Sequence, residues 1–267
     1  MAHNPVDLSL ANKTAVVCGS TSGIGRACAN TLAALGARIL LISRDQSKLD
    51  AVKAELPTSH AQSHATLAAD FSKPAELDAL LAERVSKGLA VHILINNTGG
   101  PPAGQAIDAA PDAFRAAFEA HLICNHILAT RLVPAMKAAK YGRIINIIST
   151  SVKAPIPGLG VSNTIRGAVA SWAKTLASEL GPFNITVNNV LPGFTATERL
   201  TSLVEGRAKK ASKTNAEIEA DLKATIPLAR FAEPAETAAA VAFLASPAAG
   251  YISGINLPVD GGRLPTL

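Results

Sequence analysis

Apolar runs alternate with amphipathic stretches along nearly the whole chain. Seven short runs are almost continuously apolar, which is typical of parallel strands buried on both faces. These predicted strands are Thr14–Cys18, Ala37–Ile42, Ala65–Ala69, Val91–Ile95, Arg143–Ile148, Thr186–Leu191 and Gly254–Val259. The stretches between them have a helical period, and the predicted helices are Gly25–Leu35, Asp45–Glu55, Pro74–Ser86, Pro111–Lys140, Gly160–Leu180 and Pro234–Leu244.

This alternation predicts an α/β fold, a Rossmann-type doubly wound sheet of seven parallel strands with helices on both faces. The 267 residues suit one large domain, and no linker or repeat interrupts them, so we expect a single domain over 1–267. One stretch departs from the pattern, the polar and basic segment Phe194–Arg230. An insertion beyond the carboxyl end of a strand lies over the ligand crevice of such a sheet. The segment is therefore either a lid or a solvated surface helix.

Composition excludes several classes of protein. Hydrophobic residues make up 48% and charged residues 17%, which excludes a disordered or fibrous chain. The net charge of +5 is spread out and aromatic residues are only 4%, so we expect no nucleic-acid partner. We also expect no membrane span and no secretory signal, since no apolar run has the required length or flanks. The three cysteines predict neither a disulfide nor a metal site, and they favour the cytoplasm.

A glycine-rich loop follows the first predicted strand and leads into the first helix. Its spacing is Gly19-x3-Gly23-x-Gly25. Glycines allow backbone N–H groups to approach a pyrophosphate, and the helix N-terminus behind them favours an anion. The loop therefore predicts dinucleotide binding through Gly19, Ser20, Thr21, Ser22, Gly23, Ile24 and Gly25.

The end of the second strand indicates which dinucleotide. An NAD site usually has a carboxylate there for the ribose hydroxyls. This chain has Ser43 and Arg44, and a guanidinium pairs well with a 2′-phosphate. NADP(H) is therefore the preferred cofactor, with NAD(H) as the alternative if Arg44 is an ordinary surface arginine. Asp45 is better placed as the N-cap of the next helix. Asp70 ends the third strand, where ligands of this fold collect.

Four motifs together resemble the short-chain dehydrogenase/reductase family over nearly the whole chain. They are the loop Cys18–Gly25, the element Asn96–Gly99 with Thr98 in place of alanine, the pair Pro192-Gly193 followed by Thr197, and the terminal Val259–Gly262. Thr98–Pro102 and Leu159–Asn163 look most like a divergent branch labelled 3-oxoacyl-acyl-carrier-protein reductase-like. The resemblance implies that Asn97, Gly99, Pro192, Gly193 and Thr197 contact the cofactor. It also implies a homodimer or homotetramer built through Pro111–Lys140 and Gly160–Leu180.

The catalytic pattern of the family is only partly present. Ser149 matches its serine, but Ser162 stands in the tyrosine position and Arg166 in the lysine position. His121 stands in the position of the asparagine. Tyr141 and Tyr251 do not replace the missing phenol, because both precede strands and so belong to the opposite end of the sheet.

Each substitution changes the expected chemistry. Serine is a much weaker acid than tyrosine, so Ser162 cannot simply take over proton transfer. Arg166 keeps a cationic contact to the nicotinamide ribose but stays protonated. His121 either titrates near neutrality and passes protons through water, or is an ordinary helix histidine. Lys153 either swings over the site as a proton donor or lies on a surface loop.

Two functions follow from these residues. The first is an NADP-dependent oxidoreductase acting on a small carbonyl or acyl compound, or on the corresponding secondary alcohol, with a non-standard proton donor. The alternative is a catalytically silent NADP(H)-binding module or sensor. The basic residues Arg207, Lys209, Lys210 and Lys213 of the polar segment either bind an anionic substrate group or are solvated surface charges.

Overall fold

The computed structural model describes residues 6–266 and contains one sheet of seven parallel strands. The order across the sheet is β3-β2-β1-β4-β5-β6-β7. The chain adds β2 and β3 on one side of β1 and then crosses over to add β4 to β7 on the other side, so the order switches between β1 and β4. The strands are β1 Thr14–Cys18, β2 Arg38–Ser43, β3 Ala65–Ala68, β4 Ile93–Asn96, β5 Gly142–Ile147, β6 Ile185–Pro192 and β7 Asn256–Val259. The predicted doubly wound fold is confirmed, with most strand ends within one or two residues of the expected ones.

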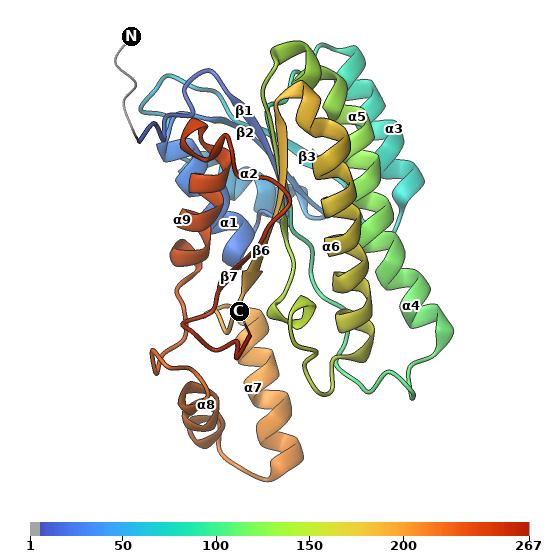
Figure 1. Ribbon diagram of the computed structural model, residues 1–267, viewed down its shortest axis with the longest axis vertical. Coiled ribbons are helices and arrows are strands. Elements are labelled where there is room, and N and C mark those ends of the chain that lie inside the picture. Colours follow the sequence, from blue (N-terminus) through green and yellow to red (C-terminus); the bar gives the residue numbers. More distant parts are fainter. Residues whose placement is uncertain (1–5, 267) are drawn as a thin grey trace.

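Helices cover both faces of the sheet (Figure 1). One face carries α1 Gly23–Ala34, α2 Gln46–Glu55 and α9 Pro234–Ala245. The other carries α3 Pro74–Ser86, α5 Cys124–Ala139 and α6 Gly160–Leu180, with α4 Pro111–Phe118 beside α6. Proline occupies the first turn of α3, α4 and α9, where its missing N–H costs no helical hydrogen bond.

The helix expected over Pro111–Lys140 is interrupted. A π turn, η1 Glu119–Ile123, separates α4 from α5, and Pro134 lies inside α5. The π turn contains neither glycine nor proline, so the sequence did not reveal the break. Such turns occur frequently at functional sites, and this one contains His121.

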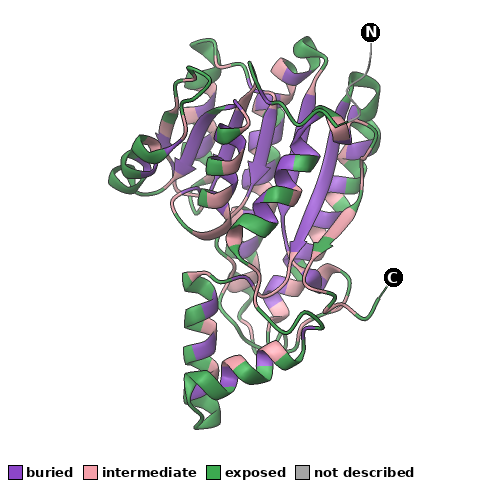
Figure 2. Ribbon diagram, turned by 90° about the vertical axis from the view of Figure 1, so that its left-hand side faces the viewer, coloured by how far each residue is buried: buried purple, intermediate pink, exposed green. Residues whose placement is uncertain are grey.

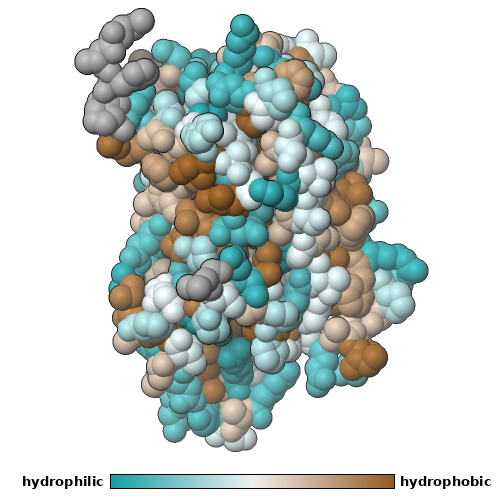
Figure 3. Space-filling view, in the orientation of Figure 1, coloured by the Kyte–Doolittle hydropathy of each residue, from teal (hydrophilic) through white to brown (hydrophobic). Residues whose placement is uncertain are grey.

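The polar segment after β6 folds into two helices, α7 Glu198–Ala211 and α8 Asn215–Ala224. They project from one end of the molecule and are hydrophilic over much of the face shown (Figure 3). A small cluster of buried side chains joins them: Leu200, Val204, Ala208, Ile218 and Leu222, packed against Phe194 and Phe231. Thr214 and Glu217 form a capping box that starts α8.

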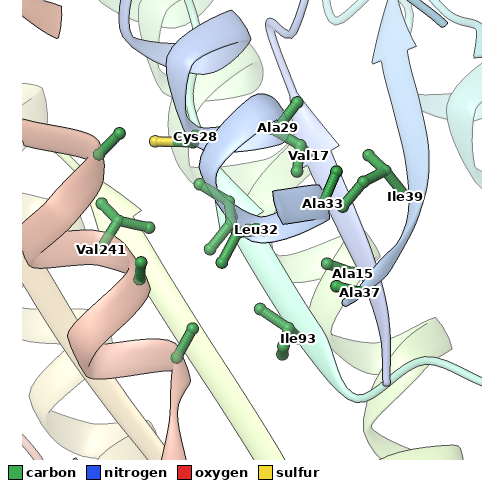
Figure 4. Close-up of a cluster of buried hydrophobic side chains, with 14 of the residues drawn as sticks. Ala15, Val17, Cys28, Ala29, Leu32, Ala33, Ala37, Ile39, Ile93 and Val241 are labelled. Carbon is green, nitrogen blue, oxygen red and sulfur yellow. The ribbon is translucent and has the colours of Figure 1, made fainter. Parts of the chain in front are cut away.

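Two apolar layers flank the strands, whose residues are largely buried (Figure 2). Between α1 and α9, Cys28 and Leu32 face Val241 beneath β1 (Figure 4). The three cysteines are buried and free, as expected. Among residues 6–266, no helix is long and apolar enough to cross a membrane.

A row of asparagines crosses the carboxyl half of the sheet. Asn96, Asn146, Asn189 and Asn256 lie opposite one another on β4, β5, β6 and β7. Each of the first three donates its side-chain N–H to the side-chain oxygen of the next, at 2.8, 2.9 and 2.8 Å. We call this row the amide ladder. It holds together the strands whose ends carry the candidate site.

Candidate active site

The glycine loop and the end of β4 are in direct contact. Gly19 has φ +58°, and a Cβ there would lie 2.6 Å from the carbonyl oxygen of Asn97. The side-chain N–H of Asn97 donates to the carbonyls of Cys18 and Gly19, at 3.2 and 3.3 Å. Only glycine fits this approach. The N-cap of α1, Ser22, makes no side-chain capping bond within the described residues, which leaves the first N–H groups of α1 available to an anion.

The groove continues from the loop toward β2 and β3. Thr21 and Ser43 lie within hydrogen-bond distance, Oγ1 to Oγ 3.3 Å. Arg44 is exposed at the rim. A backbone hydrogen bond from Ser72 lowers the pKa of Asp70, and the charge of Arg44 acts in the same direction. Asp45 caps α2 by accepting from the Lys48 N–H, as expected, and so does not face the groove as a ribose acceptor.

Most of the predicted cofactor residues line two adjoining hollows. The larger, of about 610 Å³, is lined by Gly19, Thr21, Ser22, Gly23, Ile24, Ser43, Arg44, Asp70, Asn97, Gly99 and Thr197. The smaller, of about 210 Å³, is lined by Pro192, Gly193 and Arg166, and again by Ile24, Asn97 and Thr197. The larger hollow runs from the glycine loop, at Gly19–Gly23, to Ser43 and Arg44 at the end of β2.

Two predicted cofactor residues, Ser20 and Gly25, are not among the residues that line these hollows. The Ser20 side chain is fully buried and donates to the carbonyl of Ile42. A Cβ on Gly25 would lie 2.1 Å from the carbonyl oxygen of Gly19. Both residues therefore shape the loop from within and do not offer a side chain to a ligand.

The three candidate proton donors beyond β5 occupy different environments. Ser149 is the N-cap of the short 3-10 helix Thr150–Val152, and its oxygen accepts from the Ser151 N–H. Ser162 is 8% exposed in the first turn of α6. Lys153 is exposed and follows the 3-10 helix. The structure thus puts Lys153 at the surface.

His121 is 3% exposed, and its Nδ1 lies 2.6 Å from the hydroxyl oxygen of Thr98. Burial lowers the pKa of His121 to about 3, and the charges of Arg166 and Arg199 act in the same direction. The ring is therefore neutral at physiological pH. Of the two alternatives left open by the sequence, this burial favours a neutral helix histidine over one that titrates near neutrality.

Arg166 lies one helical turn after Ser162 and is 8% exposed. Its Nη1 donates to the carbonyl of Ile147, at 3.0 Å. Burial lowers the pKa of Arg166 to about 10, and the charge of Arg199 adds to this effect. Arg199, in the first turn of α7, donates to the carbonyls of Gly100 and Pro101, both at 3.2 Å.

Sequence reasoning missed Arg199, and it noted Thr98 only as a departure from the family pattern. Both line the two hollows. The one available signal for Arg199 was its position two residues after Thr197. The basic residues considered instead lie elsewhere: Lys209 and Lys210 are exposed in the last turn of α7, and Lys213 pairs with Asp221.

Neither tyrosine reaches the site, as expected. Tyr141 precedes β5 and donates to the carbonyl of Ala245 at 2.7 Å. Tyr251 lies before β7 and is exposed. Among the residues described, no cluster of His, Cys, Asp or Glu is placed to hold a metal ion.

A sequence model of the family described as enoyl-(acyl carrier protein) reductase matches residues 19–263. Together with the groove and the sheet order, this match places the chain in a defined class: it belongs to the short-chain dehydrogenase/reductase family.

Particular relatives share about a third of the sequence. The NADPH-dependent reductase BacG of Bacillus subtilis is 31% identical over 267 residues, covering 97% of this chain and 100% of that protein. A 3-oxoacyl-[acyl-carrier-protein] reductase of Synechocystis is 32% identical over 96% of this chain and 98% of that protein. The crystal structure of L-sorbose reductase from Gluconobacter frateurii, complexed with NADPH and L-sorbose, is 31% identical with a TM-score of 0.91. It covers 98% of this chain and 100% of that one.

These relationships establish the class of activity and the cofactor. The protein is an oxidoreductase of this family and binds NADP(H).

Proposed function

We propose that the protein transfers hydride between NADP(H) and the carbonyl or secondary alcohol of a small molecule, as a 3-oxoacyl reductase-like enzyme with a non-standard proton route. The proposal rests on one observation: the two hollows share lining residues and therefore adjoin. Thr98, Asn97 and Thr197 line both the long groove and the smaller cavity at the carboxyl ends of β4, β5 and β6. A cofactor in the groove thus has a substrate space at its end.

The cofactor residues divide by position. We assign the pyrophosphate to Gly19–Gly25, with Thr197 opposite: a Cβ on Gly23 would lie 3.1 Å from Thr197 Cγ2. Arg44 and Ser43 take the 2′-phosphate, and Asp70 with Gly99 bounds the groove. Arg166, Pro192 and Gly193 stand at the nicotinamide end. When bound, NADPH supplies the hydride.

The proton route does not need a side chain as acidic as tyrosine. We assign the substrate oxygen to the hydroxyls of Ser149 and Thr98. In this scheme neutral His121 carries its proton on Nδ1 and donates it to Thr98 Oγ1, so that the Thr98 hydroxyl proton points to the substrate oxygen. The positive charge of Arg166 stabilises the negative charge that develops on this oxygen. Water then supplies the proton. Ser162 and Lys153 have no part in this scheme.

The surrounding parts of the molecule complete the proposal. The two helices α7 and α8 act as a lid, since Arg199 joins α7 to the loop after β4 through its bonds to Gly100 and Pro101. A homodimer or homotetramer forms through α4, α5 and α6, and the protein acts in the cytoplasm, in keeping with three buried free cysteines.

Steady-state NADPH oxidation tests this function across ketones, oxoacids and sugars. We expect turnover with at least one class. Ser149→Ala should lower kcat by about 10² or more, because it removes a donor to the substrate oxygen. Ser171→Ala, an exposed position on α6, should leave kcat unchanged. NADPH binding without turnover on any of these compounds would identify a silent binding module instead.

A further inference from the structure

Two arginines from different helices meet over Gly100. A Cβ on Gly100 would lie 2.8 Å from Nη2 of Arg199 and 3.6 Å from Nη2 of Arg166. Both guanidinium groups therefore lie beside the same Cα, in space that a side chain would otherwise fill. Burial lowers the pKa of Arg166, and the nearby charge of Arg199 acts in the same direction.

No carboxylate neutralises this pair within residues 6–266. The ion pairs of the described chain involve neither Arg166 nor Arg199. Arg199 donates to two backbone carbonyls and Arg166 to one. Arg166 is buried and Arg199 is exposed at the mouth of the cavity. A buried guanidinium such as that of Arg166 is costly without an acidic partner, and an anion bound beside it would offset that cost. The two positive charges thus form a site for an anion, and a bound ligand would supply the negative charge.

The position of the pair indicates which anion. Arg166 lines only the smaller cavity, together with Ile147 and Ile148 from the end of β5. The glycine loop residues Gly19 to Gly23 line the longer groove instead. An anion that contacts both arginines therefore lies in the smaller cavity, which meets the groove at Ile24 and Thr197.

We propose that Arg166 and Arg199 bind a carboxylate group of the substrate, so that the enzyme acts on oxoacids in preference to neutral ketones or esters. This inference rests on the proposed function and adds the substrate class. The planar guanidinium groups present paired N–H donors that match a carboxylate. The bonds of Arg199 to Gly100 and Pro101 hold its side chain over the cavity from the lid side.

Equilibrium binding to the NADP⁺-saturated protein tests the proposal by calorimetry. The probes are acetoacetate and 2-oxobutanoate, each compared with its methyl ester. We expect each acid to bind at least about tenfold more tightly than its ester, because charge-assisted bonds are lost with the ester. Equal binding in both pairs would overturn the proposal.

Variants identify the arginine that is responsible. Arg199→Gln should weaken acid binding about tenfold or more and leave the esters and the dissociation constant of NADPH unchanged. Arg207→Gln removes the same charge two turns along α7 and serves as the matched control. Thermal unfolding checks that both variants are folded. If Arg199→Gln weakens NADPH and leaves the preference for acid over ester unchanged, the arginine serves the cofactor phosphates and the proposal is wrong.

The two proposals fail separately. Acid binding with the expected preference but no NADPH oxidation contradicts the reductase function and leaves the carboxylate site standing. Turnover of neutral ketones with no preference for acids supports the reductase function and removes the carboxylate site.

Discussion

The imidazole of His121 and the hydroxyl of Thr98 lie within hydrogen-bond distance, Nδ1 to Oγ1 2.6 Å. Each residue departs from the pattern of the family, in which the first position is asparagine and the second alanine. The structure shows that these two departures contact each other. Thr98 faces both hollows and His121 is buried behind it, so the pair is a single polar unit at the wall of the site.

The neutral state of His121 predicts a loss of stability in mild acid. The folded pKa, about 3, is below the ordinary value near 6.5, so the unfolded chain binds a proton that the folded chain excludes. The stabilisation is complete above about pH 6.5 and falls as pH drops toward 3, by about 2 kcal/mol at pH 5. Chemical denaturation at pH 8 and pH 5 measures it. His121→Asn should lose less stability than the parent on acidification, whereas the exposed control His126→Asn should behave like the parent. Identical changes in all three proteins would contradict this prediction.

Removal of the Thr98 hydroxyl tests the other half of the pair. Thr98→Val takes away one donor to the substrate oxygen and should lower kcat by about 10². The dissociation constant of NADPH should change little, and Thr130→Val on the exposed side of α5 is the control. Because His121 stays neutral, the pH profiles of kcat for the parent and for His121→Asn should be alike near pH 6.5, with no inflection in the parent that the variant lacks. Such an inflection would restore His121 as a titrating group.

Arg44 should determine the preference between the two nicotinamide cofactors. Arg44→Ala removes the cation beside the 2′-phosphate and should weaken NADP⁺ by about 1.5–3 kcal/mol, with little effect on NAD⁺. Arg38→Ala, at the opposite end of β2, is the matched control and should change neither affinity. Fluorescence titration of both cofactors measures the ratio. Equal weakening of NADP⁺ and NAD⁺ would show that Arg44 does not recognise the phosphate.

Gly100→Ala should act on the arginine pair without removing a charge. The new Cβ would lie 2.8 Å from Nη2 of Arg199, so the guanidinium must move away. We expect acetoacetate to bind about tenfold more weakly, as it would if the charge-assisted bonds were lost. Gly104→Ala places a methyl group where nothing lies within 4 Å and should bind acetoacetate like the parent. Unchanged binding in Gly100→Ala would mean that the Arg199 position is unimportant for the acid.

The amide ladder should contribute measurably to stability. Asn146 is fully buried and bonds to Asn96 on one side and Asn189 on the other. Asn146→Ala leaves the side-chain N–H of Asn96 and the side-chain oxygen of Asn189 without the partner that Asn146 provides, at a cost of about 1–3 kcal/mol for each unpaired group. Urea denaturation measures the loss, with the exposed Asn30→Ala as control. A change below about 1 kcal/mol would show that the neighbours find other partners.

The sequence predicted the strands and the glycine loop because their signals are local. Apolar runs, first-turn prolines and the Asp45 cap act within a few residues. The class of fold and the cofactor followed from these signals and from the order of the motifs. The experiments above test what each of the residues that line the groove does there.

Two of the missed features depend on contacts distant along the chain. Arg199 meets Gly100 across 99 positions, and the depth of His121 follows from the packing of the π turn against α6. The π turn has no periodic signature. Charge and burial together determine the pKa of His121, and neither can be read from the residue type.

The π turn at Glu119–Ile123 also marks a place where the chain carries one residue more than a regular helix would need. Deleting a single residue there would let α4 run straight into α5 in the same phase, so Leu128, Leu132 and Met136 would keep facing the sheet. The phase of α5 would thus be kept, while the imidazole of His121 would be withdrawn from Thr98. The extra residue in this segment therefore bears on the placement of His121 at the site and not on which face of α5 meets the sheet.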